Sequence, residues 1–120
     1  GGYGSNRIAE AAVAQMNAAA RAKTYVGFSD AGYLLAALYR ARIGQCVHGS
    51  MPVSARSEGG KEAIRRVLNW LGGDTSGVEP SVDGVTPMAA FNLITLAMIA
   101  GTPMMPDLTG HVLMVEEVAE

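Results

Sequence analysis

The sequence predicts an α/β domain in which short strands alternate with amphipathic helices. Segments rich in Tyr, Val and Phe are short, and the longer segments between them repeat apolar residues at helical spacing. The connections between these segments are also short. Strands and helices that alternate in this way form a mostly parallel, doubly wound sheet of the Rossmann or flavodoxin type, with its functional loops at the carboxyl ends of the strands.

The first helix is expected over residues 6–22 and is entered through Ser5, because apolar side chains recur there at helical spacing with charged ones between them. The β-rich segment 23–30 follows as a short strand. It ends in Ser29 and Asp30, a pair that favours capping of the next helix.

That next helix is expected over residues 31–42, and Gly44 is expected to end it. Residues 45–48 are predicted to form a second short buried strand, which places His48 at its exit. A third helix is expected over residues 57–72, where apolar and charged side chains fall on opposite faces.

The composition changes after this helix. Residues 73–86 are rich in Gly, Ser, Pro and Asp and have no apolar period, which is typical of a linker between domains. An apolar helix is predicted over 87–100 and a strand over 111–118. The chain is therefore divided into a first part, 1–72, and a second part, 87–120.

The overall composition excludes several classes of protein. The 120 residues are 49% hydrophobic and 17% charged with a net charge of −2, and no basic block is dense enough to follow a nucleic-acid backbone. The longest apolar run, 93–100, is far shorter than the roughly 20 residues that cross a bilayer. Cys46 is the single cysteine, and with His48 and His111 it lacks metal-ligand spacing. We expect no nucleic acid, membrane, metal or cofactor as a partner.

The opening GGYGSNR places Ser5 after a run of glycines and directly before a predicted helix. A serine on such a turn presents its hydroxyl to a substrate, and the N–H groups at the start of the helix can hold a developing oxyanion. The alternative is that Ser5 only caps the helix, a role that serine commonly fills. A nucleophilic serine also needs a base, usually a histidine that a carboxylate orients.

Other polar residues have a functional and a structural interpretation. His48 leaves a predicted strand, where it is either a site residue or a hydrogen-bonded loop residue, and His111 is interpreted as structural. Glu116 and Glu117 end the last strand on opposite faces, so one of them faces the core or a site unless the strand lies at an edge. Asn92, a polar residue at the start of an otherwise apolar helix, is interpreted as a helix cap or a buried hydrogen-bonding residue.

Taken together and in order, five motifs resemble those of the LD-carboxypeptidases, serine peptidases that trim murein peptides and whose relatives include the microcin C immunity hydrolases. The motifs are GGYGSNR, YVGFSD, VHGSM, FNLITLAMIAGTPMMPDLTG and VLMVEEVAE. The resemblance covers nearly the whole chain, with the linker least matched. It implies the C-terminal half of a doubly wound N-terminal domain, then a linker and the start of a smaller, β-rich domain.

The resemblance also implies roles for particular residues. Ser5 matches the nucleophile, the backbone N–H of Asn6 matches an oxyanion donor, and Glu116 matches the acid that orients the catalytic histidine. The positions that match the substrate groove are Arg7, Asp30, His48, Gly49 and Asn92. The family's histidine lies downstream of the glutamate strand, beyond these 120 residues, so we expect this chain to be an internal piece that is inactive alone.

The function implied is that of a cytoplasmic, homodimeric hydrolase that releases the terminal D-alanine of murein tetrapeptide during peptidoglycan recycling in the cell wall. Its partners would be the murein peptide and the missing N- and C-terminal segments of the same polypeptide. A hydrolase of aminoacyl-nucleotide antibiotics, which uses the same triad, is the alternative within the family. A non-catalytic α/β binding domain, in which Ser5 is only a cap, is the alternative from another class.

Overall fold

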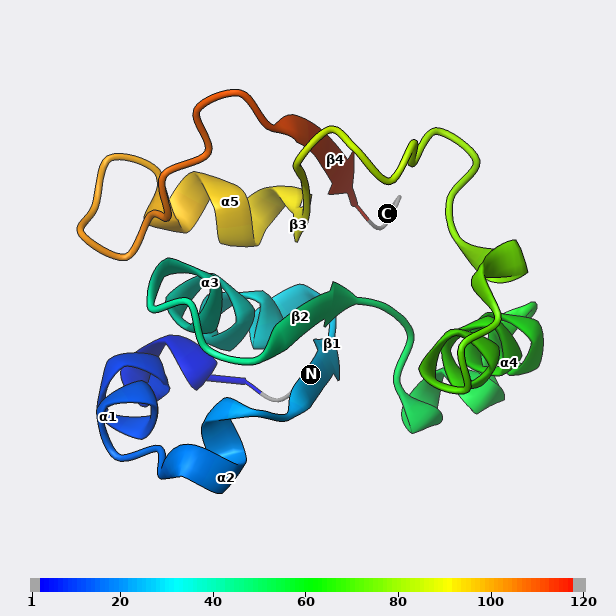
Figure 1. Ribbon diagram of the computed structural model, residues 1–120, viewed down its shortest axis with the longest axis horizontal. Helices are drawn as coiled ribbons and strands as arrows, with labels where there is room; N and C mark the ends of the chain where they lie inside the picture. Colours follow the sequence, from blue (N-terminus) through cyan, green and yellow to red (C-terminus); the bar gives the residue numbers. More distant parts are fainter. Residues whose placement is uncertain (1–2, 118–120) are drawn as a thin grey trace.

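Two pairs of parallel strands organise residues 3–117, the part of the chain that the computed structural model describes (Figure 1). β1 (Thr24–Gly27) pairs with β2 (Gln45–His48), and β3 (Met88–Asn92) pairs with β4 (Val112–Glu116). A helix connects the strands of each pair, so the predicted α/β class with parallel strands is confirmed.

The first strand pair lies close to where the sequence predicts it. β2 covers the predicted residues 45–48 but is only partly buried. β1 occupies the first half of the predicted strand 23–30, and Ser29 and Asp30 belong instead to the helical turn η2 (Ser29–Ala31). α3 (Gly32–Arg40) crosses between them and buries its small and apolar residues, among them Ala37 and Leu38. In Figure 1, α3 lies between the N-terminal helices on one side and α5 with the second strand pair on the other.

The predicted single helix over 6–22 is wrong. The structure has three short helices there, which are η1 (Ser5–Arg7), α1 (Ala9–Ala14) and α2 (Ala18–Arg21). The break has a local cause, because Asn17 adopts an extended backbone and its side chain accepts a hydrogen bond of 2.9 Å from the N–H of Ala20. The asparagine therefore starts a new helix as an N-cap instead of continuing the old one.

The end of α3 also differs from the prediction. Arg42, with φ of 55°, adopts the left-handed conformation, and the N–H of Ile43 donates to the carbonyl of Leu38 at 2.9 Å. The N–H of Arg42 donates to the carbonyl of Tyr39, which completes a Schellman motif. Gly44 (φ 63°) makes the following turn, where a Cβ would lie 2.3 Å from the carbonyl oxygen of Lys23.

The third predicted helix is present as α4 (Gly60–Leu71), after a short helical turn η3 (Pro52–Arg56). α4 packs against η3 and against η4 (Thr75–Gly77), and Figure 1 places it at the side of the molecule. The guanidinium of Arg66 donates to the carbonyl of Gly77 at 2.8 Å. The start of the proposed linker is therefore attached to α4.

The apolar helix predicted over 87–100 is wrong in its first half. Residues 88–92 form β3, and α5 (Leu93–Ile99) begins only after Asn92. The strand forms because its backbone groups pair with β4, from Met88 opposite Val112 to Asn92 opposite Glu116. β4 lies within the predicted strand, whose last residue falls outside the described residues, as do the first two glycines of GGYGSNR.

One apolar cluster joins the first part of the chain to the second. Tyr33 and Ala36 from α3 pack with Phe91 from β3 and Ile99 from α5. Partly buried residues from the second part complete this cluster: Ala89, Leu96, Met104, Met105 and Leu108. Among the helices of residues 3–117, none is both long and apolar enough to cross a membrane.

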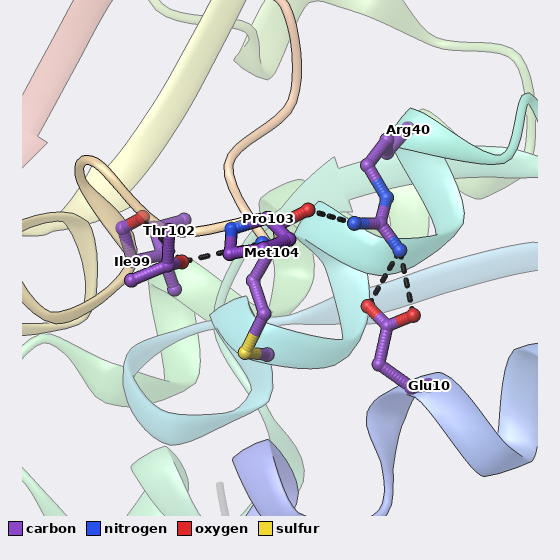
Figure 2. A network of polar contacts seen from close by, with 6 residues as sticks. All are labelled: Glu10, Arg40, Ile99, Thr102, Pro103 and Met104. Atoms are coloured by element: carbon purple, nitrogen blue, oxygen red, sulfur yellow. Dashed lines mark hydrogen bonds and ion pairs between the residues drawn. The ribbon is translucent and has the colours of Figure 1, made fainter.

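A polar network reinforces the same junction (Figure 2). The guanidinium of Arg40 donates to both carboxylate oxygens of Glu10, each at 2.6 Å, and to the carbonyl of Pro103. The hydroxyl of Thr102 donates to the carbonyl of Ile99 at 2.7 Å and thereby closes the end of α5. Arg40 therefore connects α1, α3 and the loop after α5.

Candidate functional site

The turn that carries Ser5 is held by one carboxylate. Gly4 enters the turn with φ of 97° and is the N-cap of η1, so Ser5 is the first helical residue and not the cap. The N–H of Gly4 donates to Asp30 Oδ1 at 3.2 Å, and the N–H of Ser5 donates to Asp30 Oδ2 at 2.9 Å. The Ser5 hydroxyl donates to the backbone carbonyl of Asp30.

Asp30 thus does not cap the helix that follows it, which is the role that its position in the sequence predicts. No side chain caps α3, whose N-cap is Ala31. Asp30 points instead to η1, where a carboxylate is favourable because it faces the free N–H groups of a helix start. Ser29 beside it has φ of 55°, a left-handed conformation that is costly for a residue with a Cβ.

The two residues after Ser5 are exposed. The N–H of Arg7 donates to the carbonyl of Gly4 at 3.1 Å. Within residues 3–117, no group accepts a hydrogen bond from the N–H of Asn6. A backbone N–H next to a serine hydroxyl is the donor type that an oxyanion requires.

A second cluster forms where β2 and β4 end. His48 Nε2 lies 3.6 Å from Glu116 Oε1, and the two side chains are 17% and 41% exposed. Within the described residues, His48 Nδ1 and Glu116 Oε1 are buried and have no hydrogen-bond partner. Burial lowers the pKa of His48 below its usual 6.5, and the negative charge of Glu116 opposes that shift in part.

Asn92 connects this cluster to the backbone. Its side chain is 7% exposed, and its Oδ1 accepts from the N–H groups of Ile94 (3.1 Å) and Thr95 (3.3 Å) at the start of α5. Its Nδ2 donates to the carbonyl of Glu116 at 3.5 Å and to Glu117 Oε1 at 3.3 Å. The geometry thus fits the structural interpretation of Asn92, as a cap that also anchors the end of β4.

A hydrogen bond from Thr95 to Ser29 links the two clusters. The hydroxyl of Thr95 donates to the carbonyl of Ser29 at 3.1 Å, and Ser29 precedes the residue that holds Ser5. Thr95 is 3% exposed and was not singled out from the sequence, although a threonine in an apolar helix start was the available signal. In the described part of the chain, no hydrogen bond or ion pair joins Ser5 to His48 or Glu116.

Gly49 allows close packing behind His48. Its N–H donates to the carbonyl of Gly27 at 3.0 Å, and a Cβ there would approach Val67 of α4 to 3.0 Å. His48 and Gly49 also line a cavity of about 430 Å³ between β2, α4 and β3, with largely apolar walls that include Trp70 and Val82. Ser5, Asp30 and Glu116 do not line that cavity.

The remaining histidine is engaged elsewhere. His111 Nε2 lies 2.6 Å from the hydroxyl of Tyr39, and its Nδ1 lies 3.2 Å from the carbonyl of Thr109. The two rings meet edge to face, with centroids 5.8 Å apart. Over residues 3–117, no three His, Cys, Asp or Glu side chains converge as metal ligands.

Comparison with protein-family models gives no match, and comparison with curated proteins finds no relative. The site offers a serine on a carboxylate-held turn, and within residues 3–117 no group accepts a hydrogen bond from the N–H of Asn6 beside it. It also offers a half-buried glutamate at the end of β4, with His48 Nε2 lying 3.6 Å from its Oε1. Such groups suit nucleophilic acyl transfer, in which a carboxylate orients a general base.

Proposed function

We propose that this chain belongs to a serine LD-carboxypeptidase that hydrolyses the L-to-D peptide bond and releases the terminal D-alanine of murein tetrapeptide. The main support is the Thr95–Ser29 hydrogen bond. Ser29 precedes Asp30, which holds the turn of Ser5, and Thr95 lies in α5. Asn92, the N-cap of α5, donates to the backbone carbonyl of Glu116 in β4. The proposed nucleophile Ser5 and the proposed acid Glu116 are thus connected through a series of hydrogen bonds.

The proposed reaction is acyl transfer in two steps. The Ser5 hydroxyl turns away from the Asp30 carbonyl and attacks the scissile carbonyl, while a histidine from outside these residues takes its proton. Glu116 orients that histidine, and the N–H of Asn6 stabilises the oxyanion. The histidine gives that proton to the amine of D-alanine as the peptide C–N bond breaks, and water then hydrolyses the acyl-enzyme to regenerate Ser5.

Substrate binding is assigned to groups on the turn of Ser5 and at the end of β2. The guanidinium of Arg7 is exposed and is close in sequence to Ser5, which suits the terminal carboxylate of a peptide. His48 and Gly49 lie at the end of β2, the edge at which ligands of parallel sheets bind. Asp30 acts indirectly, because its carboxylate holds the turn.

The proposal includes the finer architecture and the setting. Residues 1–72 would belong to a doubly wound domain of the Rossmann or flavodoxin type, 73–86 to a linker, and 87–120 to the start of a smaller, β-rich domain. The two βαβ connections support this division. The enzyme would act as a homodimer in the cytoplasm, where murein peptides are recycled, and flanking segments of the same polypeptide would complete it.

The test is release of D-alanine from murein tetrapeptide by the intact polypeptide. Ser5→Ala should lower kcat at least about 10³-fold, because it removes the nucleophile. Glu116→Gln should lower kcat substantially as well, because the base loses its orienting charge. Ser81→Ala, an exposed serine bonded to Glu79, is the matched control and should be fully active. Undiminished turnover by Ser5→Ala would remove Ser5 from the mechanism.

The same assay separates the alternative within the family. An aminoacyl sulfamoyl adenosine offered beside the tetrapeptide measures which leaving group the site prefers. Faster cleavage of the nucleotide would assign the antibiotic-hydrolase function to the same Ser5 and Glu116.

One observation favours a second candidate, a non-catalytic binding domain. The Ser5 hydroxyl already donates to the Asp30 carbonyl, so it is engaged in the fold. A fluorophosphonate probe decides between the two, because it labels only an activated serine. Labelling that is lost in Ser5→Ala supports the enzyme, and absence of labelling supports the binding domain.

A further inference from the structure

His48 and Glu116 approach each other from two different sheets. We infer that His48 is a positioning residue for Glu116: its Nε2–H holds one carboxylate oxygen, so that the other oxygen faces the catalytic histidine. This inference rests on the proposed function and changes the part that His48 plays in it. The resemblance places His48 in the substrate groove, whereas the geometry points it at the acid.

Both residues are fixed by their backbones before their side chains meet. His48 is in register with Gly27 in the β1–β2 pair, and the next N–H, that of Gly49, donates to the carbonyl of Gly27. Glu116 is in register with Asn92, whose amide donates to the Glu116 carbonyl. The distance between the two side chains is therefore set by anchored strand ends and not by mobile loops.

Glu116 Oε1 requires a hydrogen-bond donor. Glu116 Oε1 is buried and, within residues 3–117, accepts no hydrogen bond, although a buried carboxylate oxygen without a donor is strongly unfavourable. The nearest donor is His48 Nε2 at 3.6 Å. An approach of about 0.7 Å would give the roughly 2.9 Å of a charge-assisted hydrogen bond.

That bond determines the tautomer of His48. A neutral imidazole that donates from Nε2 leaves Nδ1 as an acceptor, and Nδ1 is the other buried atom without a partner in the described part of the chain. Glu116 is 41% exposed although its Oε1 is buried, so its exposed surface belongs to its other atoms. Oε2 is then left for the histidine that serves Ser5.

The experiment compares two substitutions of His48 in the intact polypeptide. His48→Phe keeps a flat ring without N–H groups, and His48→Gln places an amide N–H near the position of Nε2. For D-alanine release, His48→Phe should lower kcat about 10- to 100-fold with KM within about twofold, as is typical when an orienting partner is lost. His48→Gln should recover most of that loss.

His111→Phe is the matched control, because it removes the other histidine, which lies against Tyr39. Its kcat should equal that of the wild type. A raised KM with unchanged kcat in His48→Phe would return His48 to substrate binding. Equal kcat in all three variants would reduce it to a packing role. Wild-type protein that releases no D-alanine, or release that survives Ser5→Ala, would instead overturn the proposed function.

A second experiment measures the coupling between His48 and Glu116 through protein stability, without an enzyme assay. Urea midpoints are compared for His48→Phe, Glu116→Leu and the double variant. If the pair is coupled, the double variant loses less than the sum of the two single losses. Additive losses would overturn the inference even where the enzyme assay fails.

Discussion

Asp30 shows how one side chain defines the candidate nucleophile turn. Its two carboxylate oxygens accept from consecutive N–H groups, those of Gly4 and Ser5, and its own carbonyl accepts from the Ser5 hydroxyl. The left-handed Ser29 directs the backbone so that these contacts form. The sequence predicts that Asp30 caps the helix that follows it, whereas in the folded chain its carboxylate accepts from the N–H groups at the start of η1.

His48 gives a prediction at the same scale. Burial lowers its pKa from 6.5, so the unfolded chain binds more protons than the folded one between that lowered value and 6.5. The stability of the protein should therefore fall as pH falls through this window. Urea unfolding from pH 7.5 to 5.0 should show wild-type protein losing stability relative to His48→Gln.

The comparison needs a histidine outside the pair. His111→Gln, measured over the same pH range, controls for the loss of a histidine as such. Parallel pH curves for wild type and His48→Gln would show that burial of His48 does not contribute to the acid sensitivity of the fold.

At the scale of elements, the apolar pattern of the sequence predicts a helix or strand correctly where the residues of that element alone determine its conformation. β2 and α4 form where their apolar patterns predict them, although Leu68 and Leu71 on the apolar face of α4 are exposed and β2 is only partly buried. The helix predicted for residues 88–92 is wrong, because Met and Ala favour a helix and no neighbouring residue in the sequence opposes it. Pairing with β4 overrides that preference, and β4 lies more than twenty residues away.

The end of α3 gives a prediction for an element. Arg42 occupies the C′ position of a Schellman motif with φ of 55°, where glycine has no steric cost. Arg42→Gly should stabilise the protein by about 0.5–1 kcal/mol, since relief of the left-handed strain exceeds the entropy that glycine adds to the unfolded chain. The free energy of unfolding in urea measures this change.

Arg42→Ala is the matched variant, because it removes the long side chain and keeps the Cβ. It should leave stability within about 0.5 kcal/mol of the wild type, as is usual for a surface substitution. Equal gains from Gly and Ala would assign the effect to loss of the arginine and not to the backbone.

Over the whole molecule, the first and second parts of the chain are joined by a shared core and by single polar contacts. Tyr33 and Phe91 pack across the junction, Arg40 bonds to Pro103, and Thr95 bonds to Ser29. The last contact also connects the turn of Ser5 to the strand of Glu116. Its loss should therefore affect both stability and catalysis.

Thr95→Val tests that link. Valine keeps the shape of the side chain but leaves the Ser29 carbonyl without its donor, which should cost about 1–3 kcal/mol of unfolding free energy. In the proposed reaction kcat should fall too, because the turn of Ser5 loses its support. Unfolding in urea and D-alanine release measure the two effects.

Thr95→Ser keeps the hydroxyl and removes only a methyl group, so its loss should be nearer the roughly 0.8 kcal/mol of a buried carbon. A valine variant that is as stable as the serine variant would mean that the hydroxyl contributes little to the junction.

The sequence by itself determined the α/β class, the positions of β1, β2, α3 and α4, and a serine at the start of a helix. These features depend on neighbours in the chain, on apolar periodicity and on turn residues, which a single sequence displays. The tertiary structure alone decided that 88–92 is a strand, that Asp30 holds Ser5, and that His48 faces Glu116. Those outcomes depend on backbone pairing and packing between distant segments, whose free energy no local pattern contains.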